Sequence, residues 1–345
     1  MARPTRILVF RFSAMGDVAM AAAVLRDFAL QFPEVELQIV SRATFQAFFE
    51  YVPGSSFIPI DTKGKHKGIL GLFRLFRTLR LEQQPDAVAD LHDNLRSRIL
   101  STLFRLCGIP IKRIRKDREK KKALTRKKHK IRGPLLPTIH RYAQTLQAYG
   151  FDFHLRAHLT PQPNSLSDLD YLFQNSQMPY IGISPFAQHA TKVYPLNRME
   201  ALVEYLSGKG YNVLLFGGGK KEADLCQQWQ ERFPNTFNCI GSYSLAEELK
   251  IISRLTLMLS MDSAGMHMAS LMQIPCISIW GSTHPDAGFM GYGQKIEDAV
   301  QIDLACRPCS VYGNIPCYRK DHACMHGIEL QMIIDKIENK LQEYA

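Results

Sequence analysis

Short runs of apolar residues alternate with longer amphipathic stretches along the first half of the chain. Residues 6–11, 36–41 and 87–91 are rich in Ile, Leu, Val and Ala, a composition typical of strands that are buried on both faces. Residues 70–81 instead carry apolar side chains at helical spacing, with arginines on the other face. Strands that alternate with helices predict a mostly parallel sheet with right-handed crossovers.

The same alternation begins again at Tyr180 and continues through the second half of the chain. A proline-rich, polar stretch at 161–165 (PQPNS) is the predicted connection between the two halves. We therefore predict two Rossmann-like domains, residues 1–165 and residues 166–326. The last segment, 327–345, is amphipathic, and we predict that it forms a helix that packs back toward the first domain.

One strand–turn–helix segment, residues 255–269, has the pattern of a ligand site. Its apolar first half predicts a buried strand, and the residues DSAG at 262–265 predict a sharp turn into a helix. Open α/β sheets bind ligands where a strand ends and a helix begins, because free backbone N–H groups and the helix dipole favour phosphate there. Asp262 is equally explained as a helix cap and His267 as a satisfied helix residue, so both interpretations stay open on this segment alone.

Other charged side chains follow predicted strands in the same way. Lys192 lies in a polar loop after a strand, where its ammonium group would reach a phosphate. The glycines at 217–219 free the backbone to approach a ligand, and Glu222 follows them. Asp17 comes directly after Gly16 in the first half, where a carboxylate would serve as a general base toward a hydroxyl. Each has a plainer alternative: Lys192 is a surface lysine, the glycines form a tight turn, and Asp17 is a helix N-cap.

Composition narrows the function classes. The chain has 345 residues and 46% hydrophobic residues, ample for two cores. Neither a secretory leader nor a membrane-spanning run is predicted, so we expect a cytoplasmic protein whose eight cysteines are mostly thiols. No GxGxxG fingerprint follows either first strand, which argues against a nicotinamide dehydrogenase.

The net charge of +11 is concentrated in one segment. Residues 112–132 hold thirteen Lys or Arg against one Asp and one Glu. Such a segment attracts nucleic acid, anionic lipid or a phosphorylated glycolipid, or it is simply a solvated surface loop. No aromatic residue interleaves the run, which argues against a single-stranded nucleic-acid site.

The cysteines are densest near the end of the chain. A CxxC pair is followed by two more cysteines within fifteen residues, a compact set for a structural zinc site. The alternative is a loop packed by neutral thiols. These residues are Cys306, Cys309, Cys317 and Cys324.

Taken together, these motifs resemble glycosyltransferase family 9, the heptosyltransferases of the lipopolysaccharide inner core. The likeness rests on residues 7–25 (ILVFRFSAMGDVAMAAAVL), on 261–285 (MDSAGMHMASLMQIPCISIWGSTHP) and on the C-x-x-C…C…CM segment at 306–325. It implies a GT-B fold, with two Rossmann-like domains whose parallel sheets face across a cleft. It also implies an inverting transfer from ADP-L-glycero-β-D-manno-heptose to a lipid A-linked inner-core acceptor, without metal or cofactor.

The resemblance assigns roles to individual residues. Asp17 matches the family's catalytic base, Lys192 its diphosphate-binding lysine and Glu222 its ribose contact. Tyr243 falls near the expected adenine position, and Thr191 stands beside the diphosphate-binding lysine. The sugar- and phosphate-binding motif falls on Asp262, Ser263, Ala264 and His267.

Some positions depart from the family pattern. Ala187 and Gln188 stand where some relatives have a Thr-Thr pair, and Ala264 stands where glycine is frequent. The donor sugar is therefore less firmly implied than the fold. A GT-B transferase that uses another nucleotide sugar for a different surface glycan is the first alternative. A zinc-stabilised nucleic-acid-binding protein is the second.

For the basic segment, we expect contact with the anionic inner-membrane surface, where a phosphorylated, lipid-linked glycan acceptor would lie, rather than with nucleic acid. Salt would screen that contact. The protein would then be cytoplasmic and peripherally associated with the inner membrane. The residues expected to face the acceptor or the membrane are Lys120, Lys121, Lys122, Lys127 and Lys128.

Overall fold

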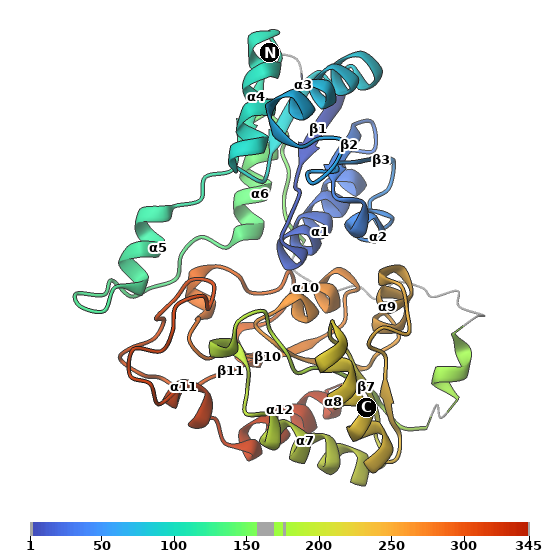
Figure 1. Cartoon of the computed structure of the whole chain (residues 1–345), viewed down its shortest axis with the longest axis vertical. Coiled ribbons are helices and arrows are strands. Elements are labelled where there is room, and N and C mark those ends of the chain that lie inside the picture. Colours follow the sequence, from blue (N-terminus) through green and yellow to red (C-terminus); the bar gives the residue numbers. More distant parts are fainter. Residues whose placement is uncertain (1–2, 157–168, 175–176, 344–345) are drawn as a thin grey trace. The chain divides into compact units, whose positions relative to one another are not determined.

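The computed structural model describes residues 3–156, 169–174 and 177–343. It divides into two compact units, shown in Figure 1. Unit 1 comprises Met1–Lys116 and Leu136–Ala157, and unit 2 comprises Asp117–Leu135 and His158–Ala345. The stretch 117–135, which we had expected inside the first domain, thus belongs to unit 2. The predicted linker at 161–165 lies outside the described residues.

Unit 1 is built on a five-stranded parallel sheet, as its apolar runs predict. The strand order is β3-β2-β1-β4-β5, with all neighbours parallel. The strands are β1 (Arg6–Phe10), β2 (Glu36–Ser41), β3 (Ser55–Pro59), β4 (Ala87–Asp90) and β5 (Ile111–Arg113). The helices are α1 (Met15–Gln31), α2 (Gln46–Phe49), α3 (Gly68–Thr78), α4 (Leu95–Leu106) and α6 (Thr138–Gln147).

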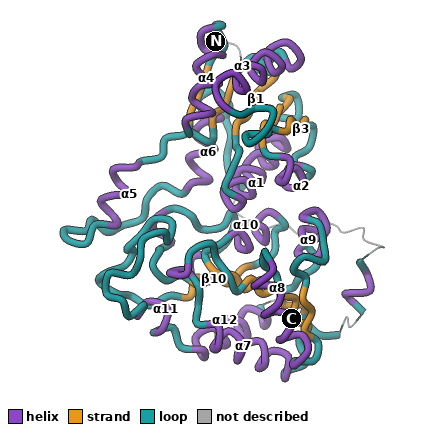
Figure 2. Tube along the Cα trace, viewed as in Figure 1, coloured by secondary structure: helices purple, strands orange, loops and turns teal. Residues whose placement is uncertain are grey.

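Unit 2 repeats this plan with six parallel strands in the order β11-β10-β9-β6-β7-β8. Figure 2 shows strands in orange and helices in purple in each unit. The strands are β6 (Tyr180–Ser184), β7 (Asn212–Leu215), β8 (Thr236–Asn238), β9 (Leu257–Met261), β10 (Cys276–Ile279) and β11 (Ala299–Val300). The helices are α5 (Arg118–Thr125), α7 (Leu196–Gly208), α8 (Lys220–Arg232), α9 (Leu245–Ile252), α10 (Ala264–Leu271), α11 (Ala323–His326) and α12 (Leu330–Gln342).

The C-terminal helix α12, which we predicted to pack back toward the first domain, belongs to unit 2. It buries Ile333, Ile334, Ile337 and Leu341 in the core of that unit. It contacts α7 and β9 of that unit. These four side chains lie at 3- and 4-residue spacing, so one apolar stripe is enough to attach the helix to the nearest sheet. Among the described residues, no helix is long and apolar enough to cross a membrane.

The strand orders locate a switch point in each sheet. In unit 1 the chain runs outward from β1 through β2 to β3 and then returns to β4 on the other side of β1. In unit 2 it runs outward from β6 to β8 and returns to β9. Ligands of doubly wound sheets bind at the carboxyl ends of the strands on either side of this point. The candidate residues Asp17, Lys192 and Asp262 all follow these strands.

Candidate functional site

The switch point of unit 2 brings two of the predicted residues together. Lys192 ends a single 3-10 turn (Ala190–Lys192) after β6, and Asp262 directly follows β9. The Lys192 Nζ lies 3.1 Å from the Asp262 Oδ2, and both side chains are largely shielded from solvent. The structure therefore places an ammonium group, held by a carboxylate, where the fold predicts a ligand.

The neighbour of this lysine fixes its position. Thr191 is buried, and its hydroxyl donates to the carbonyl oxygen of Gly313 and accepts a 3.0 Å hydrogen bond from the Ser282 hydroxyl. The Lys192 methylenes pass so close to Gly313 that a Cβ there would collide with them. Gly313 also has φ +82°, which favours glycine. Thr191 thus acts on the site by anchoring the loop that carries Lys192.

The N-terminus of α10 is the second part of this site. Its N-cap residue, Ser263, makes no side-chain capping hydrogen bond among the described residues; its hydroxyl lies 3.2 Å from that of Ser260. Ser263 and Ala264 are half-buried, and their backbone N–H groups begin the helix. Uncapped N–H groups at a helix start favour an anion. His267 lies buried in the same helix.

A glycine lets this helix approach the sheet. A Cβ on Gly265 would lie 2.6 Å from the Ser184 Cβ and 2.9 Å from the Ser260 Oγ. These neighbours belong to β6 and β9, the two strands of the switch point. The small residue in the DSAG turn is therefore required for close packing, and it brings the start of α10 against the ends of both strands.

The glycine-rich turn before α8 is held by Glu222. The Oε2 of Glu222 accepts a 2.8 Å hydrogen bond from the Gly218 N–H. A Cβ on Gly217 would lie 2.7 Å from that same oxygen. Gly219, at φ +93°, is the N-cap of the helix. Glu222, the residue expected to contact the ribose, thus already uses one of its carboxylate oxygens to shape the turn.

Tyr243 has a partner that the sequence did not indicate. Its hydroxyl lies 2.7 Å from that of Tyr171, which comes from the short turn Asp170–Phe173. Burial and the nearby Tyr171 hydroxyl raise the pKa of Tyr243. The two rings form a pair just before α9.

In unit 1, Asp17 lies in the first turn of α1 and forms an ion pair with Arg11. Arg11 follows β1 and is buried; its Nη1 donates a 2.8 Å hydrogen bond to the Leu91 carbonyl oxygen, and its guanidinium lies over the Tyr142 ring. We did not predict this arginine. Its position directly after a buried strand, shared by Asp262, was the available indication.

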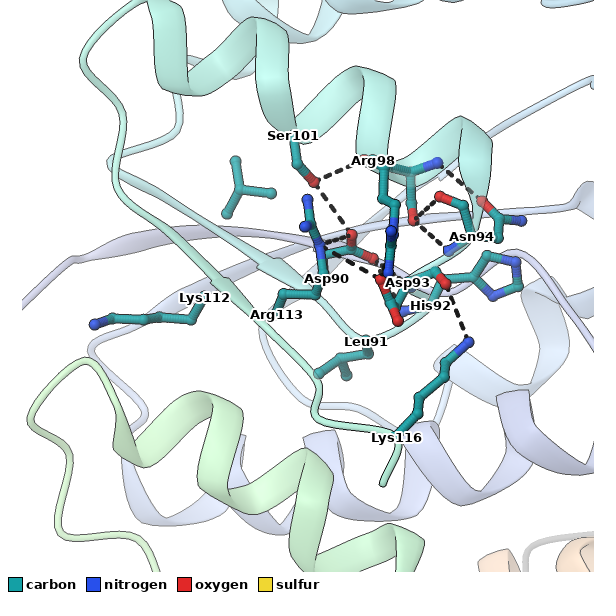
Figure 3. A network of polar contacts seen from close by, with 12 residues as sticks. Asp90, Leu91, His92, Asp93, Asn94, Arg98, Ser101, Lys112, Arg113 and Lys116 are labelled. Atoms are coloured by element: carbon teal, nitrogen blue, oxygen red, sulfur yellow. Dashed lines mark hydrogen bonds and ion pairs between the residues drawn. The ribbon is translucent and has the colours of Figure 1, made fainter. Parts of the chain in front are cut away.

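The loop after β4 holds a second, structural network (Figure 3). Asp90 is fully buried and accepts hydrogen bonds from the His92 N–H at 3.1 Å, the Asp93 N–H at 2.8 Å and the Arg113 Nε at 2.9 Å. Asp93 in turn accepts from the Arg98 Nε at 2.7 Å. Because these carboxylates are committed to the loop and its arginines, they shape the unit 1 switch point rather than supply a base.

His92 stands beside the Asp17–Arg11 pair in this network. Burial, followed by the positive charges of Arg11, Lys116 and Arg42, lowers its pKa from 6.5 to about 3. The imidazole is therefore neutral at physiological pH, and its ring packs 5.1 Å from that of Phe12.

The basic segment packs on unit 2 through some of its lysines. Lys121 is buried, with its ammonium 4.4 Å from the Phe289 ring centroid, so it does not present its charge to solvent as we had expected. Lys127 is exposed, but its ammonium group lies over the Tyr318 ring. The remaining members of the expected set are exposed: Lys120, Lys122 and Lys128.

The cysteine-rich loop carries free thiols. Within the part of the chain that the structure describes, no group of three or more His, Cys, Asp or Glu is arranged to hold a metal ion. Instead, the Cys309 thiol donates to the Cys306 carbonyl oxygen, and the Lys130 Nζ donates to the carbonyl oxygens of Cys306 and Pro308. Burial and the neighbouring thiol raise the pKa of Cys309 to about 11. The start of this loop is thus held by hydrogen bonds that a thiol and a lysine donate to backbone carbonyl oxygens.

These features define a class. Two doubly wound α/β units with charged residues at their switch points give the GT-B fold of the solved heptosyltransferases. Two similar structures are a glycosyl transferase family 9 protein from Veillonella parvula (TM-score 0.75, 20% identity, 98% of each chain covered) and E. coli ADP-heptose lps heptosyltransferase II (TM-score 0.68, 20% identity, 99% of this chain and 100% of that one).

The family follows from the sequence match. Residues 72–317 match the model of glycosyltransferase family 9 (heptosyltransferase), so the chain belongs to this family and is a glycosyltransferase. The lipopolysaccharide core heptosyltransferase OpsX of Haemophilus influenzae is 24% identical over 293 residues, which cover 82% of this chain and 80% of that protein. The family membership contradicts our second alternative, a nucleic-acid-binding protein.

Proposed function

We propose that this glycosyltransferase moves a heptose from ADP-L-glycero-β-D-manno-heptose to a lipopolysaccharide inner-core acceptor with inversion at the anomeric carbon. The observation that carries the proposal is the Lys192–Asp262 pair beside the uncapped start of α10, at the switch point of unit 2. A site with an ammonium group and free helix N–H groups suits a diphosphate. The family match and an ADP-heptose-dependent structural relative support the choice of donor.

On the donor side, the leaving ADP develops negative charge on its β-phosphate. Lys192 and the N–H groups of Ser263 and Ala264 would stabilise that charge. Such preorganised donors typically contribute about 3–4 kcal/mol each to the transition state. Glu222 would direct its remaining carboxylate oxygen to the ribose of ADP, and the Tyr171–Tyr243 pair would border the adenine ring.

On the acceptor side, Asp17 would take the proton from the attacking hydroxyl. Its carboxylate keeps one oxygen on Arg11, which is itself fixed by the Leu91 carbonyl, so the base is oriented before substrate binds. The deprotonated oxygen attacks the anomeric carbon from the face opposite ADP, and this displacement inverts the configuration. A positioned base of this kind contributes about 10²–10⁴-fold to the rate.

Peripheral association with the anionic inner leaflet is part of the proposal. The exposed lysines Lys120, Lys122, Lys127 and Lys128 would meet the lipid phosphates, while Lys121 stays on Phe289. Each Lys near such a surface contributes about 1 kcal/mol. Neutralising the four exposed lysines should weaken binding to anionic vesicles; unchanged binding would remove this segment from the proposal.

A nucleotide panel tests the donor. Purified protein is heated with ADP, GDP, UDP, CMP or ADP-heptose, and its Tm is recorded. A ligand at one hundred times its Kd adds about 2.7 kcal/mol of stability. Selective stabilisation by ADP and ADP-heptose would support the proposal. Selective stabilisation by another nucleotide would instead favour our first alternative, a GT-B transferase that uses another nucleotide sugar for a different surface glycan.

A further inference from the structure

Unit 1 exposes a cluster of large apolar side chains on two adjacent helices. Ile69, Leu70 and Phe73 project from the first half of α3, and Leu95 begins α4. Ile69, Leu70 and Leu95 are 74–77% exposed, although the same stretch of α3 buries Leu72 in the core. We call these four residues the α3–α4 apolar surface. Leucine and isoleucine side chains grouped at this exposure mark an interaction site in soluble and membrane-bound proteins alike.

A pocket opens within this surface. It has a volume of about 370 Å³ and lies between the start of α3 and the start of α4. Its lining residues are Gly68, Ile69, Leu72, Asn94, Leu95, Arg96 and Ile99. The surface is therefore hollowed and mostly apolar, which suits aliphatic chains.

Basic residues flank the apolar positions in the sequence, between Asp61 and Glu82 and again after Asp93. Residues 62–81 contain six Lys or Arg and no Asp or Glu, and residues 94–106 of α4 and its N-cap contain three Arg and no Asp or Glu. The exposed cations nearest to the apolar positions in sequence are Lys65, Lys67, Arg74, Arg77, Arg96 and Arg98, of which Arg98 is paired with Asp93. The combination of an apolar stripe and a basic border is the pattern of a helix that lies in a lipid interface.

The turn before α3 holds this arrangement in one conformation. The Asp61 carboxylate accepts hydrogen bonds from the backbone N–H groups of Lys63, Gly64 and Lys65, at 2.8–3.1 Å. The Asp61 N–H donates to the Nδ1 of the buried His66. A Cβ on Gly71 would lie 2.5 Å from the His66 carbonyl carbon, so α3 packs directly on the turn. The lysines of the turn and the apolar residues of α3 are thus presented together.

We propose that the α3–α4 apolar surface docks unit 1 on an anionic lipid bilayer, with Ile69, Leu70, Phe73 and Leu95 inserted among the acyl chains. The basic border matches lipid phosphates. A second copy of this chain is disfavoured as the occupant, because it would bring two basic borders together. The four residues of this surface lie outside the basic segment 112–132.

The inference deepens the proposed function, because it assigns part of its membrane association to named residues. The two are tested apart. Transfer to a deacylated, water-soluble acceptor reports the reaction without a bilayer, whereas vesicle binding reports the surface without the reaction.

The first experiment measures flotation of the full chain with vesicles of phosphatidylethanolamine and phosphatidylglycerol. The variant Ile69→Ser/Leu70→Ser/Phe73→Ser should bind these vesicles at least tenfold more weakly than the wild type. The matched control Leu30→Ser/Leu106→Ser/Ile296→Ser removes three exposed apolar residues elsewhere and should bind like the wild type. Both variants should keep the wild-type Tm and transfer to the deacylated acceptor.

Two results would overturn the proposal. One is wild-type binding by the Ile69/Leu70/Phe73 variant. The other is a wild type that fails to float with anionic vesicles while it still transfers heptose, which would leave the proposed reaction intact. Equal binding to phosphatidylcholine vesicles would contradict the role of the basic border.

A second experiment locates the inserted residue. Both native tryptophans, Trp229 and Trp280, are buried in unit 2, so a new tryptophan at the surface can be followed against them. Leu70→Trp fluorescence should be quenched by vesicles that carry brominated acyl chains, and Leu106→Trp fluorescence should not. Equal quenching of both variants, or of neither, would contradict insertion at α3.

Discussion

Each unit carries a candidate-site ion pair at its switch point, and the two pairs differ in how exposed their partners are. In the Arg11–Asp17 pair, the cation is buried and the carboxylate is 27% exposed. In the Lys192–Asp262 pair, the carboxylate is the more shielded partner, at 8% exposed, and the ammonium reaches it on a flexible stem beside the start of α10. The carboxylate is therefore clearly the exposed partner in unit 1, whereas both partners are shielded in unit 2 and the lysine, at 13% exposed, is slightly the more accessible one. This difference matches the two halves of the proposed transfer, a proton acceptor and a site for a diphosphate.

The largest expected effect comes from removing the outward carboxylate. Asp17→Asn keeps the shape of the side chain and a hydrogen-bonding oxygen for Arg11, but it cannot take a proton. Transfer should fall about 10²–10⁴-fold, as expected for loss of a positioned base. ADP should still raise the Tm as in the wild type. Asp152→Asn, an exposed aspartate of the same unit, is the control and should keep full turnover. If Asp17→Asn turns over normally, the carboxylate is not the base.

The next largest effect concerns Lys192, the cation of the ion pair in unit 2. Lys192→Ala removes an ammonium group and leaves Asp262 facing the diphosphate. A charged hydrogen bond contributes about 1.5–3 kcal/mol, so the Kd for ADP should rise about 10–100-fold in calorimetric titration. Lys250→Ala, at an exposed position of α9, should leave the Kd unchanged. An ADP affinity that is the same in both variants would contradict the assignment of Lys192.

The close packing of α10 predicts a third effect. In Gly265→Ala, the new Cβ meets Ser184 and Ser260, and overpacking of this kind costs about 1–3 kcal/mol. The Tm should fall, and ADP should bind more weakly because the helix start shifts. Gly208→Ala is the matched control: it is also helical, its Cβ has nothing within 4 Å, and its Tm should not fall. Equal Tm values for the two variants would show that the helix start is not tightly fixed.

The smallest effect concerns pH. In the unfolded chain His92 takes up a proton near pH 6.5, but in the folded protein its pKa is about 3. The unfolded state therefore binds more protons between these values, and stability falls as pH drops from 6.5 toward 3. One histidine contributes about 1.4 kcal/mol per pH unit in this range. Denaturant unfolding at pH 7 and pH 5.5 should show a smaller loss in His92→Gln than in the wild type. His140→Gln, at an exposed site, should keep the wild-type pH dependence.

The sequence was enough to predict most strands of the two sheets, because the spacing of apolar residues and the composition of each apolar run report burial directly. The strands at Glu36–Ser41 and Tyr180–Ser184 have the predicted bounds. β5 was not predicted: its three residues include two basic ones, and it lies in the charged run. Its place is set by pairing with β4, which is a long-range contact.

The site was predictable only in part, because its contacts, like the pairing of β5, join residues that are far apart in the sequence. Asp17, Lys192 and Asp262 follow strands, so the pattern identifies their positions. Their partners do not follow from local pattern, because ion pairs such as that of Arg11 depend on the folded loop. Charge alone misplaced Lys121, which is buried with its ammonium group over the Phe289 ring instead of in solvent.

The most direct test of the account is a mass-spectrometric transfer assay. Purified wild-type protein is incubated with ADP-heptose and a deacylated, lipopolysaccharide-derived inner-core acceptor. The account predicts that the acceptor gains the mass of one heptose and that ADP is released in equal amount. If the acceptor stays unchanged with ADP-heptose but gains a sugar from another nucleotide donor, the proposed donor is wrong.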